Sequence, residues 1–222
     1  MTKDHNIIRF TWLPYKSTCY LTMDTLILAS KSPRRREILH QLGIPFIVCN
    51  IEIDEAAHYR KTVRSSVMNV SRKKAEEAAS GFTSGLVLGV DTVVFFNGRV
   101  LGKPENAEQA RAFIRMLSGN RHEVLSGITV RDAGSGHTRS GCSISSVQFV
   151  RMSNEEIEGY VQWDDWVDKA GGYAIQGRAA LFIRRIEGSY YNIMGLPVEK
   201  LYTLLRGFEY FRSDGNHLPV RR

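Results

Sequence analysis

Short apolar runs alternate with helical patterns along this chain, and this alternation constrains its fold more than any other feature. Runs such as Phe46 to Val48 and Leu86 to Val90 have the length and composition of buried strands. Residues 62–79 are rich in Lys, Glu and Ala and predict a helix between them. Strands that alternate with helices are typical of an α/β domain, and 222 residues suit one such domain with a sizeable core.

Local signals place the other expected elements. Thr25 to Ala29 is predicted as the first buried strand, and Ser32-Pro33 begins a helix that ends at Gly43. Asn97-Gly98 predicts a tight hairpin turn. Further helices are expected from Asn106, from the capping-box pair Ser153 and Glu156, and from Pro197, and further strands at 93–96, 99–101, 124–130, 143–150, 181–186 and 190–194, the last two paired.

The two ends of the chain lack this regular pattern. Apolar stretches near the start are short and broken by Arg9, Pro14 and Lys16, which is not the pattern of a signal peptide. We therefore expect residues 1–23 to be an N-terminal extension, with Met23 as an alternative start. The packed domain is expected over 24–206, and 207–222 as a poorly ordered tail.

Composition excludes several classes of protein. No run approaches the roughly 20 apolar residues that a membrane helix needs, so no membrane partner is expected. The three cysteines are odd in number and show no redox or metal-ligand spacing, which fits a reducing, cytoplasmic compartment. The net charge of +7 favours a polyanionic partner, either nucleic acid or nucleotide phosphates.

Three arginines crowd the first turn of the helix expected after Ser32. A helix N-terminus carries about half a positive charge and normally recruits Asp or Glu. Arg34, Arg35 and Arg36 are therefore unfavourable there unless an anion sits among them. Together with the Ser30 hydroxyl and free backbone N–H groups they predict a phosphate site. A solvated basic patch, partly offset by Glu37, is the alternative.

Asp91 follows the apolar run Leu86 to Val90, so we expect it at or near the carboxyl end of a buried strand. Ligands of α/β proteins bind at that edge of the sheet. A carboxylate there could hold a divalent metal or accept a proton from an attacking water. Asp54 and Glu55 could add a metal ligand. The alternatives are an Asp that caps the turn at Thr92 and an acidic pair in a solvated loop.

Two further loops carry candidate binding residues. Lys103 precedes Pro104 after the hairpin and suits phosphate, although an exposed loop lysine would look the same. Gln176 lies in a glycine-rich segment, 169–177, and could hydrogen-bond a pyrimidine edge. An exposed turn is the alternative. Lys74 belongs to a run of basic residues on a helix, where such charges are commonly solvated.

Taken together, the segments from about 24 to 206 resemble the Maf-like nucleotide pyrophosphatases, also known as septum formation inhibitors. The chain departs from the usual pattern at Val90, Gly172 and Ala174, where the family has Ala, Ala and Gly. The matching pieces, in the family order, are Leu28 to Arg35, Val90-Asp91-Thr92, Gly102-Lys103-Pro104, Leu117-Ser118-Gly119, Asp168 to Gly171, Ile175-Gln176-Gly177 and Gly195-Leu196-Pro197.

The resemblance implies a mixed twisted sheet with flanking helices, two lobes around a central cleft, and in many members a homodimer. It implies hydrolysis between the α and β phosphates of dTTP or UTP with Mg²⁺ or Mn²⁺, and a house-cleaning role linked to cell division arrest. The roles carried over are proton acceptor for Asp91, metal ligands for Asp91 and Glu55, phosphate binding for Ser30, Arg34, Arg35, Lys74 and Lys103, and base choice for Arg34, Thr92 and Gln176.

Two other functions stay open at this point. One is a septation regulator that binds nucleotide or nucleic acid without turnover, which the net charge of +7 would suit. A pure binder of polyanions, however, has no need of the carboxylates Asp91 and Glu55, so we expect no nucleic-acid partner. The other is an enzyme of the same fold that acts on a modified nucleotide.

Overall fold

A computed structural model describes residues 26–54 and 62–211. Seven strands form one sheet in the order β2-β1-β3-β5-β6-β7, with β4 also paired to β3. β1 runs parallel to β2 and β3, and the other pairs are antiparallel. The predicted mixed sheet is therefore confirmed. The strands are β1 Leu26–Ala29, β2 Phe46–Val48, β3 Leu86–Phe96, β4 Arg99–Leu101, β5 Arg121–Asp132, β6 Thr138–Phe149 and β7 Ile183–Glu187.

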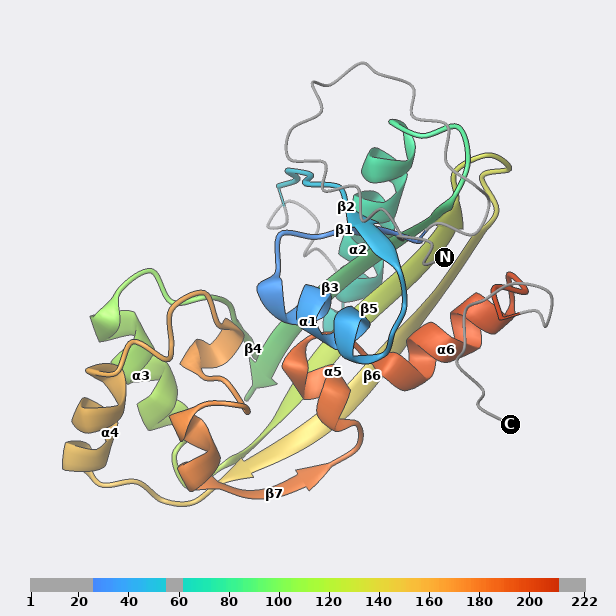
Figure 1. Ribbon diagram of the computed structural model, residues 1–222. Coiled ribbons are helices and arrows are strands. Elements are labelled where there is room, and N and C mark those ends of the chain that lie inside the picture. Colours follow the sequence, from blue (N-terminus) through green and yellow to red (C-terminus); the bar gives the residue numbers. More distant parts are fainter. Residues whose placement is uncertain (1–25, 55–61, 212–222) are drawn as a thin grey trace, which may run out of the picture.

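Helices flank both faces of the sheet (Figure 1). α2 covers one face, and α1, α5 and α6 lie on the other. A smaller lobe, built from α3, α4 and the segment around η2, extends from one end of the sheet, which gives the predicted two-lobed shape. The bounds are α1 Pro33–Gln41, α2 Val63–Ala79, α3 Ala107–Leu117, α4 Asn154–Val161, α5 Tyr190–Met194 and α6 Val198–Arg206, with the 3-10 turns η2 Ala170–Gly172 and η3 Arg178–Phe182.

Two glycines let α2 lie directly on the sheet. A Cβ at Gly89 in β3 would lie 2.8 Å from the backbone nitrogen of Ala75, and closer still to the carbonyl of Ser71. A Cβ at Gly127 in β5 would lie 2.6 Å from the nitrogen of Met68. Because no side chain separates the helix from these strands, the position of α2 over β3 is closely fixed.

Two expected strands differ from the structure. Leu86–Val90 and 93–96 are one continuous strand, because β5 pairs with β3 without interruption from Leu86 to Phe95. Asp91 therefore lies inside β3, and its predicted place at the end of a strand was wrong.

The expected strand at 190–194 is the short helix α5. Its first turn is capped by the Ser189 hydroxyl, which accepts from the Asn192 N–H, and Gly195 ends it in the left-handed conformation. β7 pairs with β6 instead, and Leu181 and Phe182 belong to η3. The expected pairing of 181–186 with 190–194 was therefore also wrong.

The packed structure continues beyond the predicted boundary at residue 206. Tyr210 is buried, and Phe208 and Phe211 pack against the main hydrophobic core. Within the described ranges, no helix is both long and apolar enough to span a bilayer.

Candidate functional site

The edge of β3 that faces β1 is interrupted halfway along. β1 pairs with β3 only from Leu86 to Gly89, and β4 pairs with it from Val94 to Phe96. Residues 90–93 of β3 have no strand partner in either of these ladders, whereas β5 pairs continuously along the opposite edge. Asp91 and Thr92 lie in this gap, next to the turn where the chain leaves β1 at Ser30.

Asp91 is buried and is bound by Lys74 of α2. The Lys74 ammonium lies 3.2 Å from Asp91 Oδ1 and donates to the Val90 carbonyl at 3.3 Å. Both side chains are nearly inaccessible, with exposed fractions of 10% for Lys74 and 4% for Asp91. Breaking a buried ion pair by removing one partner is costly, because the other charge is left uncompensated. Lys74 therefore fixes the orientation of the Asp91 carboxylate.

Arg35 holds together the opposite side of the same gap. Its Nε donates to the Gly195 carbonyl at 2.8 Å, and its two terminal nitrogens donate to Ser30 Oγ at 2.9 Å and Thr92 Oγ1 at 3.3 Å. Thr92 Oγ1 also lies 2.8 Å from Ser126 Oγ. Arg35 is buried, so its guanidinium braces β1, β3 and the end of α5 against one another.

Thr92 and Asp91 are neighbours in one strand, so their side chains point to opposite faces of the sheet. Asp91 meets α2 on one face, and Thr92 meets Arg35 of α1 on the other. The Ser32-Pro33 start of α1 is confirmed, with Pro33 in the first turn, but the Ser32 hydroxyl makes no cap hydrogen bond. Instead the Ser32 N–H donates to Ser30 Oγ at 3.2 Å.

Arg34 faces the small lobe. Burial lowers the pKa of its guanidinium, while its interactions with Tyr160 and Glu37 act in the opposite direction. Tyr160 is buried at the end of α4 and donates to the Gly172 carbonyl at 3.1 Å. Burial also raises the pKa of Tyr160, and Arg34 opposes that shift. Tyr160 therefore links the arginine-rich start of α1 to the glycine-rich segment.

Lys103 and Gln176 are both exposed. Lys103 lies 3.5 Å from Asp168. The turn after Gln176 is held by Asp165, which accepts from the Arg178 N–H at 3.0 Å, and the Arg178 guanidinium lies 4.6 Å from the centre of a Trp163 ring. The substrate contacts of Lys103 and Gln176 stay predictions.

Glu55 lies outside the described residues. Among those that are described, no group of three or more His, Cys, Asp or Glu side chains gathers in a way that could hold a metal ion. Of the two predicted metal ligands, Asp91 is the one that lies within the described residues. Mg²⁺ is commonly bound through one or two carboxylates and the phosphates of a substrate, so the chemistry of Asp91 fits such an ion without a larger cluster.

Three site residues were missed or left without a role by sequence reasoning. Ser126 is a hydroxyl inside the apolar run of β5, and that contrast was its only signal. Gly195 contributes a backbone carbonyl, which no side-chain pattern announces. Tyr160 lay in a helix where an aromatic residue is ordinarily a packing residue.

Fold and site together define a class of protein. It is an α/β protein with a mixed sheet, in which an arginine-rich helix start adjoins a buried carboxylate at a gap in the sheet. The comparisons agree on a family. A family model described as "Maf-like protein" matches residues 25–208. The chain belongs to the Maf family.

Three curated relatives cover most of this chain and are each named "dTTP/UTP pyrophosphatase". The protein of Syntrophus aciditrophicus is 44% identical over 82% of this chain and 89% of its own length. That of Alkaliphilus metalliredigens is 42% identical over 82% and 95%, and that of Methanosarcina barkeri 41% over 83% and 94%.

Similarity to a solved structure is weaker. The Staphylococcus aureus Ham1 protein is 12% identical to this chain, with a TM-score of 0.43, and the match covers 83% of this chain and 99% of that one. The fold is therefore defined by the strand order and pairing of this chain alone.

Proposed function

We propose that this chain is a nucleoside triphosphate pyrophosphatase that hydrolyses dTTP and UTP to the monophosphate and pyrophosphate. The names of relatives at 41–44% identity support this substrate class, because their matches span more than four-fifths of this chain. The structural observation that carries the proposal is the buried Asp91 carboxylate, held by Lys74 at a gap in the sheet beside the arginine-rich start of α1.

In the proposed reaction, Asp91 orients a water molecule and accepts a proton from it. The water oxygen forms a bond to the α-phosphorus, the bond from that phosphorus to the bridging oxygen breaks, and pyrophosphate leaves. Lys74 acts as a positioning residue, because its ammonium already binds the Asp91 carboxylate. General-base catalysis of this kind contributes typically about 10²- to 10⁴-fold to the rate.

The α1 side of the gap supplies the proposed phosphate clamp. Arg35 is fully engaged with Ser30, Thr92 and Gly195, so we assign it the task of shaping the clamp. Arg34 and Lys103 would provide the cationic contacts to phosphate, and the Ser30 hydroxyl a further hydrogen bond. Arginine suits this task because its planar fork matches phosphate oxygens.

We further propose that Mg²⁺ or Mn²⁺ acts as the cofactor. Asp91 and Glu55 would hold it, and the ion would neutralise charge on the phosphate oxygens. The Lys74 ammonium, 3.2 Å from Asp91, shares the same carboxylate and limits how that carboxylate can turn toward an ion. Activity lost on chelation and restored by Mg²⁺ or Mn²⁺ would support this assignment.

We propose that the small lobe selects the base of the nucleotide. Gln176 is exposed and lies on the segment that Tyr160 and Asp165 hold in place, where its amide could both donate to and accept from a pyrimidine edge. Arg34 and Thr92 would complete the choice. We also propose a cytoplasmic location and a homodimer, for which the family resemblance is the support.

The decisive experiment is pyrophosphate release from a panel of nucleoside triphosphates by the wild type and by Asp91→Asn. Release from dTTP and UTP, reduced at least about 10²-fold in a folded Asp91→Asn, is the expected result. Release from other bases would keep the chemistry and reject the assignment of Gln176. An Asp91→Asn variant with full activity would refute the proposed mechanism, and no release from any nucleotide would favour a binding protein without turnover.

A further inference from the structure

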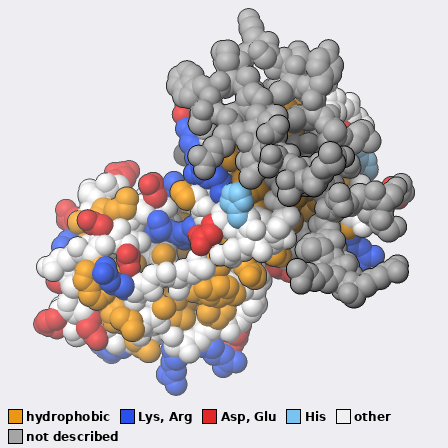
Figure 2. Space-filling view, viewed as in Figure 1, with side chains coloured by type: hydrophobic (Ala, Val, Ile, Leu, Met, Phe, Trp, Pro, Cys, Tyr) orange, Lys and Arg blue, Asp and Glu red, His pale blue; other side chains and the backbone are white. Residues whose placement is uncertain are grey.

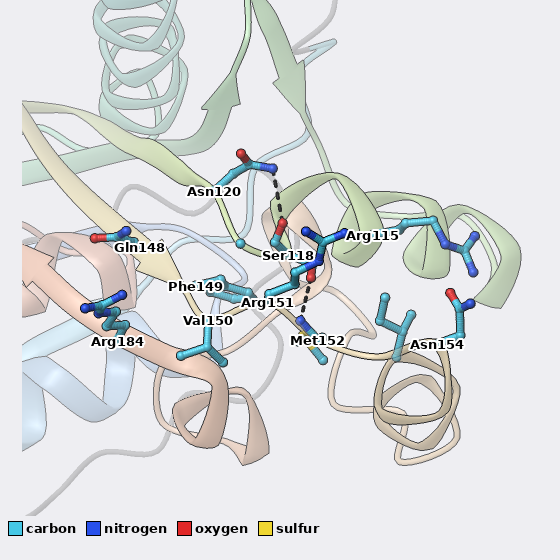
Figure 3. Close-up of a pocket in the computed structure, with 12 residues that line it drawn as sticks. Arg115, Ser118, Asn120, Gln148, Phe149, Val150, Arg151, Met152, Asn154 and Arg184 are labelled. Carbon is cyan, nitrogen blue, oxygen red and sulfur yellow. Dashed lines mark hydrogen bonds between the residues drawn. The ribbon is translucent and has the colours of Figure 1, made fainter.

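The described residues form a cavity of about 640 Å³ well away from Asp91. It lies between the end of α3, the start of α4, the end of β6 and β7 (Figure 3). Gln148 in its wall pairs with Arg121 of β5, whereas Asp91 pairs with Gly127, six residues further along that strand. At about 3.3 Å for each residue, Gln148 lies about 20 Å from Asp91 along the direction of the strands.

Three arginines line this cavity, and its lining contains no acidic residue. Within the described residues, the side chains of Arg151 and Arg184 form no hydrogen bond or ion pair. Arg115 lies 3.9 Å from Glu158, but that carboxylate is bound much more closely, at 2.6 Å, by Arg111. Unpaired cations in a concave wall favour an anionic ligand.

A bulge between β6 and β7 sets the position of Arg184. Gln148 pairs with Arg185, but the next residue, Phe149, pairs with Ile183, so Arg184 is left over between the two pairs. Bulges of this kind re-aim a side chain and are common next to functional sites. Arg184 therefore lies beside Gln148 in the wall of the cavity.

The rest of the wall is held by hydrogen bonds within the protein. Ser118 Oγ accepts from the Met152 N–H at 2.7 Å, and the Asn120 amide donates to the Ser118 carbonyl at 3.1 Å. Figure 3 shows Gln148 and Arg184 on one side of the cavity, Arg115 and Asn154 on the other, and Arg151 in the connection between them. The cavity is thus preformed, and its arginines come from three separate segments.

We propose that this cavity is a second anion site, which takes a small molecule with two or more phosphate groups. Figure 3 places Arg184 and Arg115 on opposite sides of the cavity, so a diphosphate or a nucleotide could contact more of its arginines than a single phosphate could. The volume falls within the range of about 300–1,000 Å³ typical of small-molecule sites. The proposal does not rest on the chemistry assigned to Asp91.

The test measures the binding of radiolabelled inorganic pyrophosphate to the full chain by equilibrium dialysis. The double variant Arg151→Ala/Arg184→Ala is expected to bind one pyrophosphate fewer per chain than the wild type, or to bind it at least about tenfold more weakly. The double variant Arg64→Ala/Arg72→Ala removes the same two charges from exposed positions of α2 and is expected to bind pyrophosphate as the wild type does.

Thermal unfolding of each variant establishes that it is folded. Because Arg151 and Arg184 are exposed, their loss is expected to leave the unfolding temperature unchanged. Equal binding by the double variant and the wild type would overturn the proposal, whether or not the chain hydrolyses nucleotides. Equal loss in Arg64→Ala/Arg72→Ala would also overturn it, because the effect would then be one of net charge alone.

Discussion

Replacing Gly89 by Ala is expected to push α2 away from β3 at the candidate site. The backbone of Gly89 is that of an ordinary strand, so Ala can adopt it without strain, and any effect must come from contact. The added Cβ would lie 2.8 Å from the Ala75 nitrogen, whereas ordinary contacts begin at 3.4 Å. The difference requires α2 to retreat by about 0.6 Å at Ala75, and further at Ser71, to reach ordinary van der Waals contact.

That displacement has both an energetic and a catalytic consequence. Overpacking typically costs about 1–3 kcal/mol. We expect the upper end of that range, because the two atoms closest to the added Cβ belong to the backbone of α2. Lys74 lies between Ser71 and Ala75 in sequence, so its 3.2 Å contact with Asp91 would lengthen. The expected result is a loss of about 3 kcal/mol in the free energy of unfolding. The kcat is expected to fall by more than the loss of folded protein accounts for.

Urea unfolding followed by circular dichroism measures the first quantity, and pyrophosphate release from dTTP measures the second. Gly141→Ala is the matched control, because its Cβ would meet nothing closer than 3.8 Å. The control is expected to stay within about 0.5 kcal/mol of the wild type. A Gly89→Ala protein as stable and active as the control would refute the argument that close packing of α2 positions Lys74.

Three further outcomes are expected. Burial lowers the pKa of His122 to about 4, so as pH falls below the ordinary value of about 6.5 the ring takes up a proton in the unfolded chain while it stays neutral in the folded one. Stability should therefore drop by about 2 kcal/mol between pH 7 and pH 5, and urea unfolding of His122→Phe should lack this drop. Arg35→Lys should lose about 2 kcal/mol in urea unfolding, because a single ammonium cannot replace the three directed donors that reach Gly195, Ser30 and Thr92; unchanged stability would contradict the bracing role. Lys74→Met should lower kcat about 10²-fold and change its pH profile, with partial rescue by Lys74→Arg, whereas an unchanged profile would show that Lys74 does not act through Asp91.

Local signals predicted the elements whose geometry is decided by a few neighbouring residues. Asn97 and Gly98 both take the left-handed conformation of the expected hairpin turn. The side chain of Asn106 caps α3, and Ser153 and Glu156 form the expected capping box. In each case the hydrogen bond or backbone angle involved lies within four residues, so the sequence contains the whole cause.

Elements decided by distant partners were predicted less well. The pattern of 190–194 suits a strand or a helix, and the outcome depends on β6, which pairs with β7 instead. Asp91 looked like the end of a strand because a charged residue interrupts an apolar run. The structure continues the strand through it, since Lys74 of α2 compensates the buried charge, and α2 is distant in sequence.

A ligand near Asp91 is still expected, because β1 and not β3 ends beside it. A ligand site at the edge of a parallel sheet needs a place where a neighbouring strand stops, and β1 stops at Ala29 opposite Gly89, although β3 itself continues. Because β3 continues, its alternating side chains reach both faces of the sheet at the gap. Asp91 is oriented by α2 on one face, and Thr92 by Arg35 on the other. The site therefore depends on how two helices pack against one strand, which explains why sequence could name Asp91 and Arg35 but not the distinct face that each of them serves.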